Sequence, residues 1–147
     1  MWIMIVKILS ICGILFAESI VDIKRKKVHV SGAILLAVMG IIMLFVEQRF
    51  SDITFLMSES VGIILYMISV LTEEKLGRGD AIYVLALGTL LDIREMMLVC
   101  MISFCLASFV GILLLILKKV EKQHKLAYLP FLTAGYLFYT IGNGYLL

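Results

Sequence analysis

Two acidic residues, Asp22 and Asp80, stand where long apolar stretches meet charged turns. Asp22 closes an apolar stretch in the segment ESIVDIKRKKV, and Asp80 opens another in the segment GRGDAIYVLALG. Two carboxylates at close range cannot both ionise easily, so such a pair shares a proton and titrates as a unit. The ionised carboxylate can activate a water molecule as a general base while the protonated one polarises a peptide carbonyl. The two residues therefore suit hydrolysis by acid–base catalysis, provided that the fold brings them together.

Two glycines, Gly77 and Gly79, precede Asp80. Glycine adopts backbone angles that other residues avoid and lets another backbone pass closely, so both suit a turn that receives a substrate. The simpler explanation is structural, because aspartate is a favoured helix N-cap and glycine is common in turns. Asp22 has a similar alternative role, as a solvated ion-pair partner of the basic residues that follow it. What favours the catalytic interpretation is that both aspartates are expected at one depth of a membrane.

The elements that must position these residues are membrane helices. The chain has 147 residues, of which 63% are hydrophobic and 16% charged, whereas soluble domains are about half apolar and about a quarter charged. One proline and no linker-like segment indicate a single membrane-embedded domain over residues 1–147. The net charge of +2 gives no indication of nucleic-acid binding. Cys12, Cys100 and Cys105 lack CxxC or zinc spacing, so we interpret them as small buried hydrophobic residues rather than disulfides or metal ligands.

Six apolar stretches predict an all-α, polytopic membrane protein with six transmembrane helices. They cover about residues 2–21, 28–46, 53–72, 80–95, 96–117 and 126–147. The fourth is the shortest in its apolar core, which ends before Asp92, so it must recruit the GRGD turn, thin the bilayer or be sheltered by neighbouring helices. Basic residues gather in alternate loops, and the opposite loops hold only Arg49 and Arg94. The positive-inside rule then places both termini outside the cytoplasm and brings Asp22 and Asp80 to the cytoplasmic boundary.

Around these residues the sequence resembles the type IV prepilin peptidase family, which are GxGD aspartic membrane proteases. The segment GRGDAIYVLALGTLL is similar to the GxGD motif and the helix that follows it. The segment SIVDIKRKKV, which includes Lys24, is similar to the Asp–x–Lys/Arg signature that closes the first core helix. The segment HKLAYLPFLTAGYL, which includes Pro130, is similar to the proline-aromatic segment that opens the last helix.

The resemblance implies a catalytic dyad of Asp22 and Asp80 in an endopeptidase of the cytoplasmic membrane, without metal or cofactor. The expected substrate is a prepilin-like protein, whose leader peptide is cut at the cytoplasmic face. Other expected partners are the lipid bilayer and, as possibilities, a second copy of the chain or the pilus assembly machinery. The residues implied to support substrate binding or the motifs are Gly77, Gly79, Lys24 and Pro130.

The sequence also departs from the family pattern. Larger members carry an N-terminal region with paired CxxC motifs and methylate the new N-terminus, whereas this chain starts at the first core helix. We therefore expect peptidase activity without methyltransferase activity. After Asp22 the family often has an Ile-Pro-Asn-like stretch, and here the sequence is VHVSG. The last motif keeps only Pro130, where many members have two prolines.

Three further ionisable residues lie inside apolar stretches. Glu18 precedes Asp22 by one turn on the same helix face, so it either tunes Asp22 or hydrogen-bonds a neighbouring helix, and we favour the second role. Lys7 and Glu59 lie at equal depth from the outer ends of the first and third helices, which predicts a pair between them.

Two other functions are compatible with such intramembrane acids. In a small transporter Glu18 and Glu59 would be central, since ions and protons pass through ionisable groups near the midplane. Asp22 and Asp80 lie at the membrane edge instead, which disfavours transport. A non-catalytic partner of a secretion or pilus assembly complex is the other alternative, although an inactive relative would be expected to have lost one aspartate.

Overall fold

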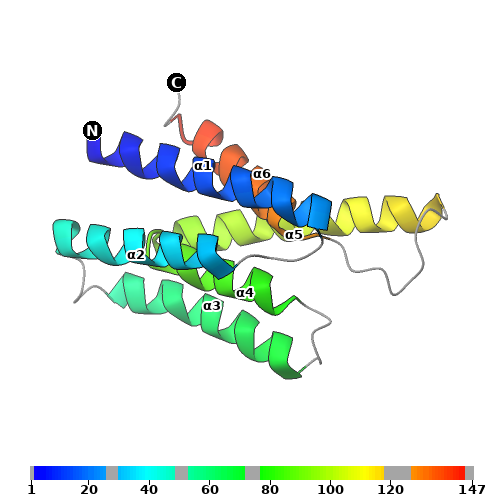
Figure 1. Cartoon of the computed structure of the whole chain (residues 1–147), viewed down its shortest axis with the longest axis horizontal. Helices are drawn as coiled ribbons and strands as arrows, with labels where there is room; N and C mark the ends of the chain where they lie inside the picture. Colours follow the sequence, from blue (N-terminus) through cyan, green and yellow to red (C-terminus); the bar gives the residue numbers. More distant parts are fainter. Residues whose placement is uncertain (1, 26–29, 49–52, 72–76, 118–126, 145–147) are drawn as a thin grey trace.

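The computed structural model describes residues 2–25, 30–48, 53–71, 77–117 and 127–144, and all regular structure within these ranges is helical (Figure 1). The predicted all-α class is therefore confirmed for the part of the chain described. Its helices, in chain order, are α1 (Trp2–Arg25), α2 (Val30–Glu47), α3 (Ile53–Leu71), α4 (Arg78–Gly88), α5 (Ile93–Ile116) and α6 (Leu129–Gly142).

Four of these helices are long and apolar enough to cross a membrane. Their candidate spans are Met4–Lys24, Val30–Glu47, Ile53–Leu71 and Ile93–Ile116. The helix α6 is apolar but shorter, with 14 residues, and α4 has only 11 residues. At 1.5 Å per residue α4 is about 16 Å long, which is roughly half the thickness of a bilayer's hydrocarbon core. The chain is thus a multi-pass membrane protein, and its crossing number and orientation stay predictions.

The boundary between the fourth and fifth helices was predicted wrongly, between residues 95 and 96. In the structure α4 ends at Gly88 and α5 begins at Ile93. Asp92 is the N-cap of α5 and forms a capping box with Glu95, whose Oε2 accepts a hydrogen bond of 3.2 Å from the Asp92 N–H. The pattern Asp-x-x-Glu resembles the sequence signature of a helix start. The prediction treated Asp92 as an interruption within one apolar segment.

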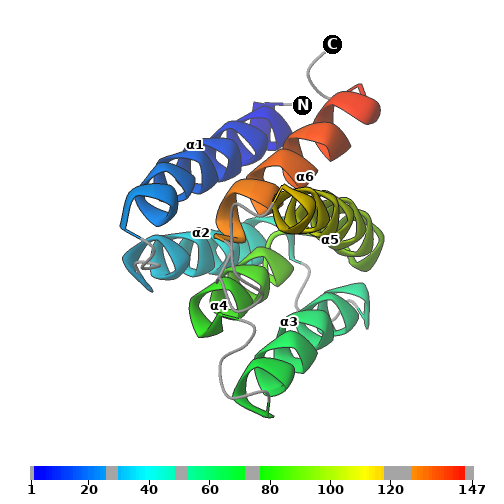
Figure 2. The same ribbon diagram turned by 90° about the vertical axis from the view of Figure 1, so that its right-hand side faces the viewer.

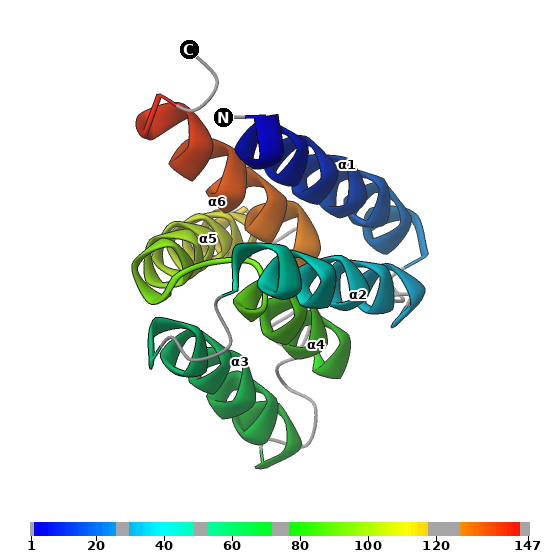
Figure 3. The same cartoon turned by 90° about the vertical axis from the view of Figure 1, so that its left-hand side faces the viewer.

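The short helix α4 lies inside the bundle. It packs against α2, α3 and α5, and Figures 2 and 3 show it among these helices. Arg78, at its start, is the only exposed residue of α4. A helix that is apolar and largely covered by its neighbours has no strong amphipathic pattern and depends on them for shelter. Of the three possibilities for the fourth apolar stretch, shelter by neighbouring helices is the one that the structure shows.

Glycines on α2 and α3 bring their backbones close to α4. A Cβ atom at Gly62 of α3 would lie 2.5 Å from the Cα atom of Leu85. A Cβ atom at Gly40 of α2 would overlap the side chain of Thr89, which follows α4 directly. Small residues at helix contacts let backbones approach closely, which is a common way of packing membrane helices. The position of α4 is therefore set by close packing on two sides.

Replacing Gly62 with alanine should destabilise the protein by about 2 kcal/mol, because the new methyl group collides with the backbone of α4 at Leu85. The measurement is thermal or denaturant unfolding in detergent micelles. Gly13→Ala in α1 is the matched control, since no atom lies within 4 Å of a Cβ atom at that position. Alanine favours helix formation over glycine by about 1 kcal/mol, so this variant should be as stable as the wild type or slightly more. Equal stability of both variants would contradict the packing of α3 on α4.

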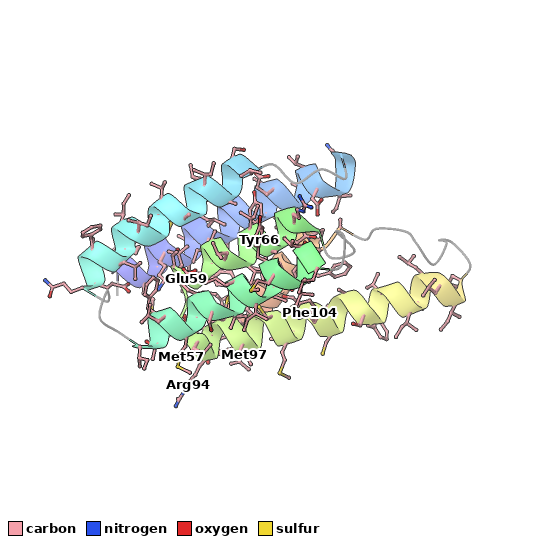
Figure 4. All side chains as sticks on the ribbon, turned by 90° about the horizontal axis from the view of Figure 1, so that it is seen from below. Met57, Glu59, Tyr66, Arg94, Met97 and Phe104 are labelled. Carbon is pink, nitrogen blue, oxygen red and sulfur yellow. The ribbon has the colours of Figure 1, made fainter. Side chains whose placement is uncertain are left out.

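The outer surfaces of α3 and α5 are apolar. Met57 and Tyr66 on α3, and Met97 and Phe104 on α5, are exposed on the face that Figure 4 shows. The second half of α5 extends beyond the other helices (Figure 1). Its large apolar side chains that are exposed include Phe109, Ile112, Leu113, Leu115 and Ile116. Apolar surface of this extent suits contact with lipid.

The predicted pair of Lys7 and Glu59 is wrong, because the structure does not bring these two residues together. α1 packs on α6 and α2, while α3 packs on α4 and α5. Figures 2 and 3 place α1 and α3 on opposite sides of α2 and α4. The Glu59 side chain, labelled in Figure 4, lies against Gly88 of α4, and its Oε1 has no hydrogen-bond partner in the described ranges. Equal depth in the membrane cannot pair two residues whose helices are not neighbours.

Candidate active site

Asp22 and Asp80 come together at one end of the bundle. Asp22 lies in the last turn of α1, and Asp80 lies in the first turn of α4. Both are buried, with 3% and 7% of their surface exposed, and they are close enough for their charges to interact. The end of α1 and the start of α4 therefore lie near each other, which no feature of the sequence alone could show.

A third helix also contributes to this site. The backbone N–H of Leu129, the first residue of α6, donates a hydrogen bond to the Asp22 carboxylate. The first N–H groups of a helix have no partner within the helix, and Asp22 satisfies one of them. Pro130 follows at the start of α6, where its missing N–H is no loss and its fixed φ angle favours a helix. Pro130 thus helps to determine where α6 begins and where the Leu129 N–H points.

Helix N-termini converge on these acids. Leu129 and Asp80 belong to the first turns of α6 and α4, and the N–H of Ala33 in the first turn of α2 bonds the hydroxyl of Tyr83 on α4. A helix N-terminus carries about half a positive charge, which stabilises nearby carboxylates. Lys24, two residues after Asp22, is exposed. Backbone N–H groups therefore contribute positive potential at the site.

The two glycines before Asp80 have ordinary backbone angles. Gly77 has φ −58° and ψ 126°, which any residue can adopt, and Gly79 is a residue of α4 without a positive φ. The prediction that these glycines use angles closed to other residues is therefore wrong. A Cβ atom at Gly77 would lie 2.6 Å from Oδ2 of Asp80. Glycine at position 77 thus leaves the space that the Asp80 carboxylate occupies.

One oxygen of each aspartate is available for chemistry. Oδ2 of Asp22 and Oδ1 of Asp80 are buried and have no hydrogen-bond partner among the residues that the structure describes. A buried carboxylate oxygen without a partner is unfavourable, so it marks a place for a shared proton, a water molecule or a substrate group. Two such oxygens on a coupled pair of carboxylates can activate water and polarise a carbonyl.

Comparison with known protein families gives the decisive observation. The chain matches the model of the type IV leader peptidase family over residues 9–116, which include Asp22, Gly77, Gly79 and Asp80. The chain belongs to the type IV leader peptidase family. Its predicted resemblance to the prepilin peptidases is thereby confirmed. The comparisons with curated proteins and with solved structures gave no match.

In this leader peptidase a further buried residue, Tyr83, lies beside the two aspartates. Its side chain is fully buried one turn after Asp80, and its hydroxyl donates a hydrogen bond to Glu18 on α1 and accepts one from the N–H of Ala33. The favoured expectation for Glu18, a hydrogen bond to a neighbouring helix, is confirmed. Sequence reasoning missed Tyr83, although its spacing of three residues from Asp80 places it on the same helix face.

Proposed function

We propose that this leader peptidase is an aspartic endopeptidase of the cytoplasmic membrane that removes the leader peptide from prepilin-like precursors. Membership of the type IV leader peptidase family supports peptidase activity. The observation that carries the aspartic mechanism is the buried pair of Asp22 and Asp80, whose carboxylates interact although they belong to different helices.

The proposed reaction uses the pair with one shared proton. The ionised carboxylate removes a proton from water, and the oxygen of that water attacks the carbonyl carbon of the scissile peptide. The protonated carboxyl donates its proton to the carbonyl oxygen as the tetrahedral intermediate forms. The intermediate then collapses, the C–N bond breaks, and the leaving nitrogen takes the proton held by the first carboxylate. The proton returned by the collapsing hydroxyl restores the starting state of the pair.

The environments of the two carboxylates suggest which plays which role. The hydrogen bond from the Leu129 N–H stabilises the negatively charged form of Asp22. We therefore assign Asp22 as the base that activates water. Asp80 accordingly acts as the acid that protonates the substrate carbonyl.

The proposed substrate reaches the site from the bilayer. The apolar outer surfaces of α3 and α5 suit a protein embedded in lipid. The N-terminal helix of a precursor can diffuse laterally through the same bilayer. The distribution of lysine and arginine among the loops predicts that the end of the bundle with Asp22 and Asp80 faces the cytoplasm. A leader peptide on the cytoplasmic side of the precursor's helix would then meet both aspartates at the water boundary.

The proposal is tested by co-expression with a prepilin-like precursor from the same genome. Mass spectrometry of the precursor should show the loss of its leader with the wild-type protein and an intact leader with the variant Asp22→Asn/Asp80→Asn. Continued leader removal by that variant would overturn the aspartic mechanism. The same spectrum reports on the new N-terminus, which we expect to be unmethylated.

A further inference from the structure

A hydrogen-bonded chain joins three helices one turn away from the two aspartates. It runs from the N–H of Ala33 on α2 to the hydroxyl of Tyr83 on α4, and from that hydroxyl to the carboxylate of Glu18 on α1. Gly32 on α2 lies directly against both partners, since a Cβ atom there would overlap the Tyr83 hydroxyl and the Glu18 carboxylate. We propose that Glu18 and Tyr83 are positioning residues that hold α1 and α4 at the spacing at which Asp22 and Asp80 act together.

The spacing of the four residues supports this role. Glu18 precedes Asp22 by four residues on α1, and Tyr83 follows Asp80 by three residues on α4, so each pair shares one helix face. α1 ends and α4 begins at the site, so both steps lead from the site into the bundle. At 1.5 Å per residue the steps are about 6 Å and about 4.5 Å. The Glu18–Tyr83 contact is therefore a second bridge parallel to the Asp22–Asp80 pair, about one turn deeper.

The helices α1 and α4 depend on this bridge because they share little other packing. The main neighbours of α1 are α6 and α2, and those of α4 are α3 and α2. Side chains rather than closely packed backbones thus join α1 to α4 at the site. Tyr83 is 0% exposed, and its ring has few rotatable bonds, so its hydroxyl is held in one place. The charge of Asp22 also acts on Tyr83, which shows how near the bridge lies to the site.

This inference rests on the proposed function only for its kinetic test. Tyr83→Phe removes the hydroxyl alone, and Glu18→Ala removes the acceptor. Each should lower kcat for leader cleavage by about tenfold or more, with KM within about twofold, because small displacements of catalytic groups affect the chemical step. The double variant should lose no more than the worse single variant, since both remove one interaction. Glu18→Gln, whose amide oxygen can still accept the hydrogen bond, should restore most of kcat.

The matched control is Tyr139→Phe on α6. Tyr139 also donates a hydrogen bond to a glutamate, Glu95 of α5, at 2.8 Å. It lies ten residues beyond Leu129 along α6, which is about 15 Å from the site end of that helix. Tyr139→Phe should therefore leave kcat unchanged. An equal loss of kcat in Tyr139→Phe and Tyr83→Phe would overturn the positioning role, because general loosening of the bundle would explain both.

A second readout does not require peptidase activity. Asp22→Cys/Asp80→Cys is prepared with Cys12, Cys100 and Cys105 replaced by alanine, and a short bifunctional thiol reagent is used to link positions 22 and 80. Addition of Tyr83→Phe should reduce the yield of this link several-fold, whereas addition of Tyr139→Phe should not. A lower yield only with Tyr83→Phe supports the positioning role even if the wild-type protein cleaves no precursor, and in that case only the proposed function fails. An unchanged yield, or no link in the parent variant, would overturn the positioning role.

Discussion

Asp22→Asn and Asp80→Asn should each lower the rate of leader cleavage by at least about a hundredfold, because a positioned acid or base contributes 10²- to 10⁴-fold. Asparagine keeps the size and shape of the side chain but can neither take a proton from water nor give one to a carbonyl. The buried position of both residues, with 3% and 7% exposed surface, leaves bulk water little opportunity to replace them. The measurement is the initial rate with purified wild-type and variant proteins in lipid or detergent.

Two further variants extend this experiment, the double variant and a control at Asp92. Asp22→Asn/Asp80→Asn should be about as slow as the slower single variant, since residues that act as one unit are strongly non-additive. Asp92→Asn is the matched control, because Asp92 caps α5 and asparagine caps a helix as well as aspartate does. It should retain nearly the wild-type rate. A wild-type rate in either single variant of Asp22 or Asp80 would contradict the dyad.

Gly77→Ala should lower cleavage by about ten- to a hundredfold, because misplacement of a catalytic group by about 1 Å can lower a rate that much. The φ and ψ angles of Gly77 suit alanine, so the backbone has no reason to change. The new methyl group would instead lie 2.6 Å from Oδ2 of Asp80 and displace that carboxylate from its position. The effect should therefore appear in kcat, measured with the same cleavage assay.

Unfolding experiments separate this local effect from a loss of folding. Gly77→Ala should unfold at nearly the wild-type temperature, unlike Gly62→Ala, whose methyl group meets the backbone of α4. Gly13→Ala should match the wild type in cleavage and be at least as stable, since its Cβ atom has no neighbour within 4 Å. A fully active Gly77→Ala variant would mean that Asp80 does not need the position that it has beside Gly77.

Apolar stretches were enough to predict six helices, but they left open how the short fourth helix is accommodated and placed its end wrongly. The length of an apolar stretch matches the thickness of the hydrocarbon core, so its two ends mark the membrane boundaries. The position of a residue within the stretch then gives its depth in the membrane. Asp22 and Asp80 could therefore be assigned to one depth before any contact between their helices was known. Their residue type suggested acid–base chemistry for a close pair, while helix capping by Asp80 and an ion pair of Asp22 were the structural alternatives.

Contacts between helices were beyond the sequence, because depth does not determine which helices are neighbours. Lys7 and Glu59 have matching depths, but α2 and α4 lie between their helices (Figures 2 and 3). Tyr83 was overlooked because its partners, Glu18 and the Ala33 N–H, come from two other helices. The start of α5, in contrast, could have been predicted from the sequence, because the capping box of Asp92 and Glu95 is a local sequence pattern.

The contribution of α6 bears on how much of the chain makes up a working unit. The family match ends at residue 116, before α6 begins. Two residues of α6 nevertheless contact α1. The Leu129 N–H donates a hydrogen bond to the Asp22 carboxylate, and Thr133 donates one of 3.2 Å to the Leu15 carbonyl oxygen. A fragment that stops after α5 would keep both aspartates and lose the backbone group that orients one of them. Supplying the last helix as a separate peptide should then restore cleavage to an otherwise inactive fragment. We therefore expect this protein to be divisible between its fifth and sixth helices into two complementing pieces.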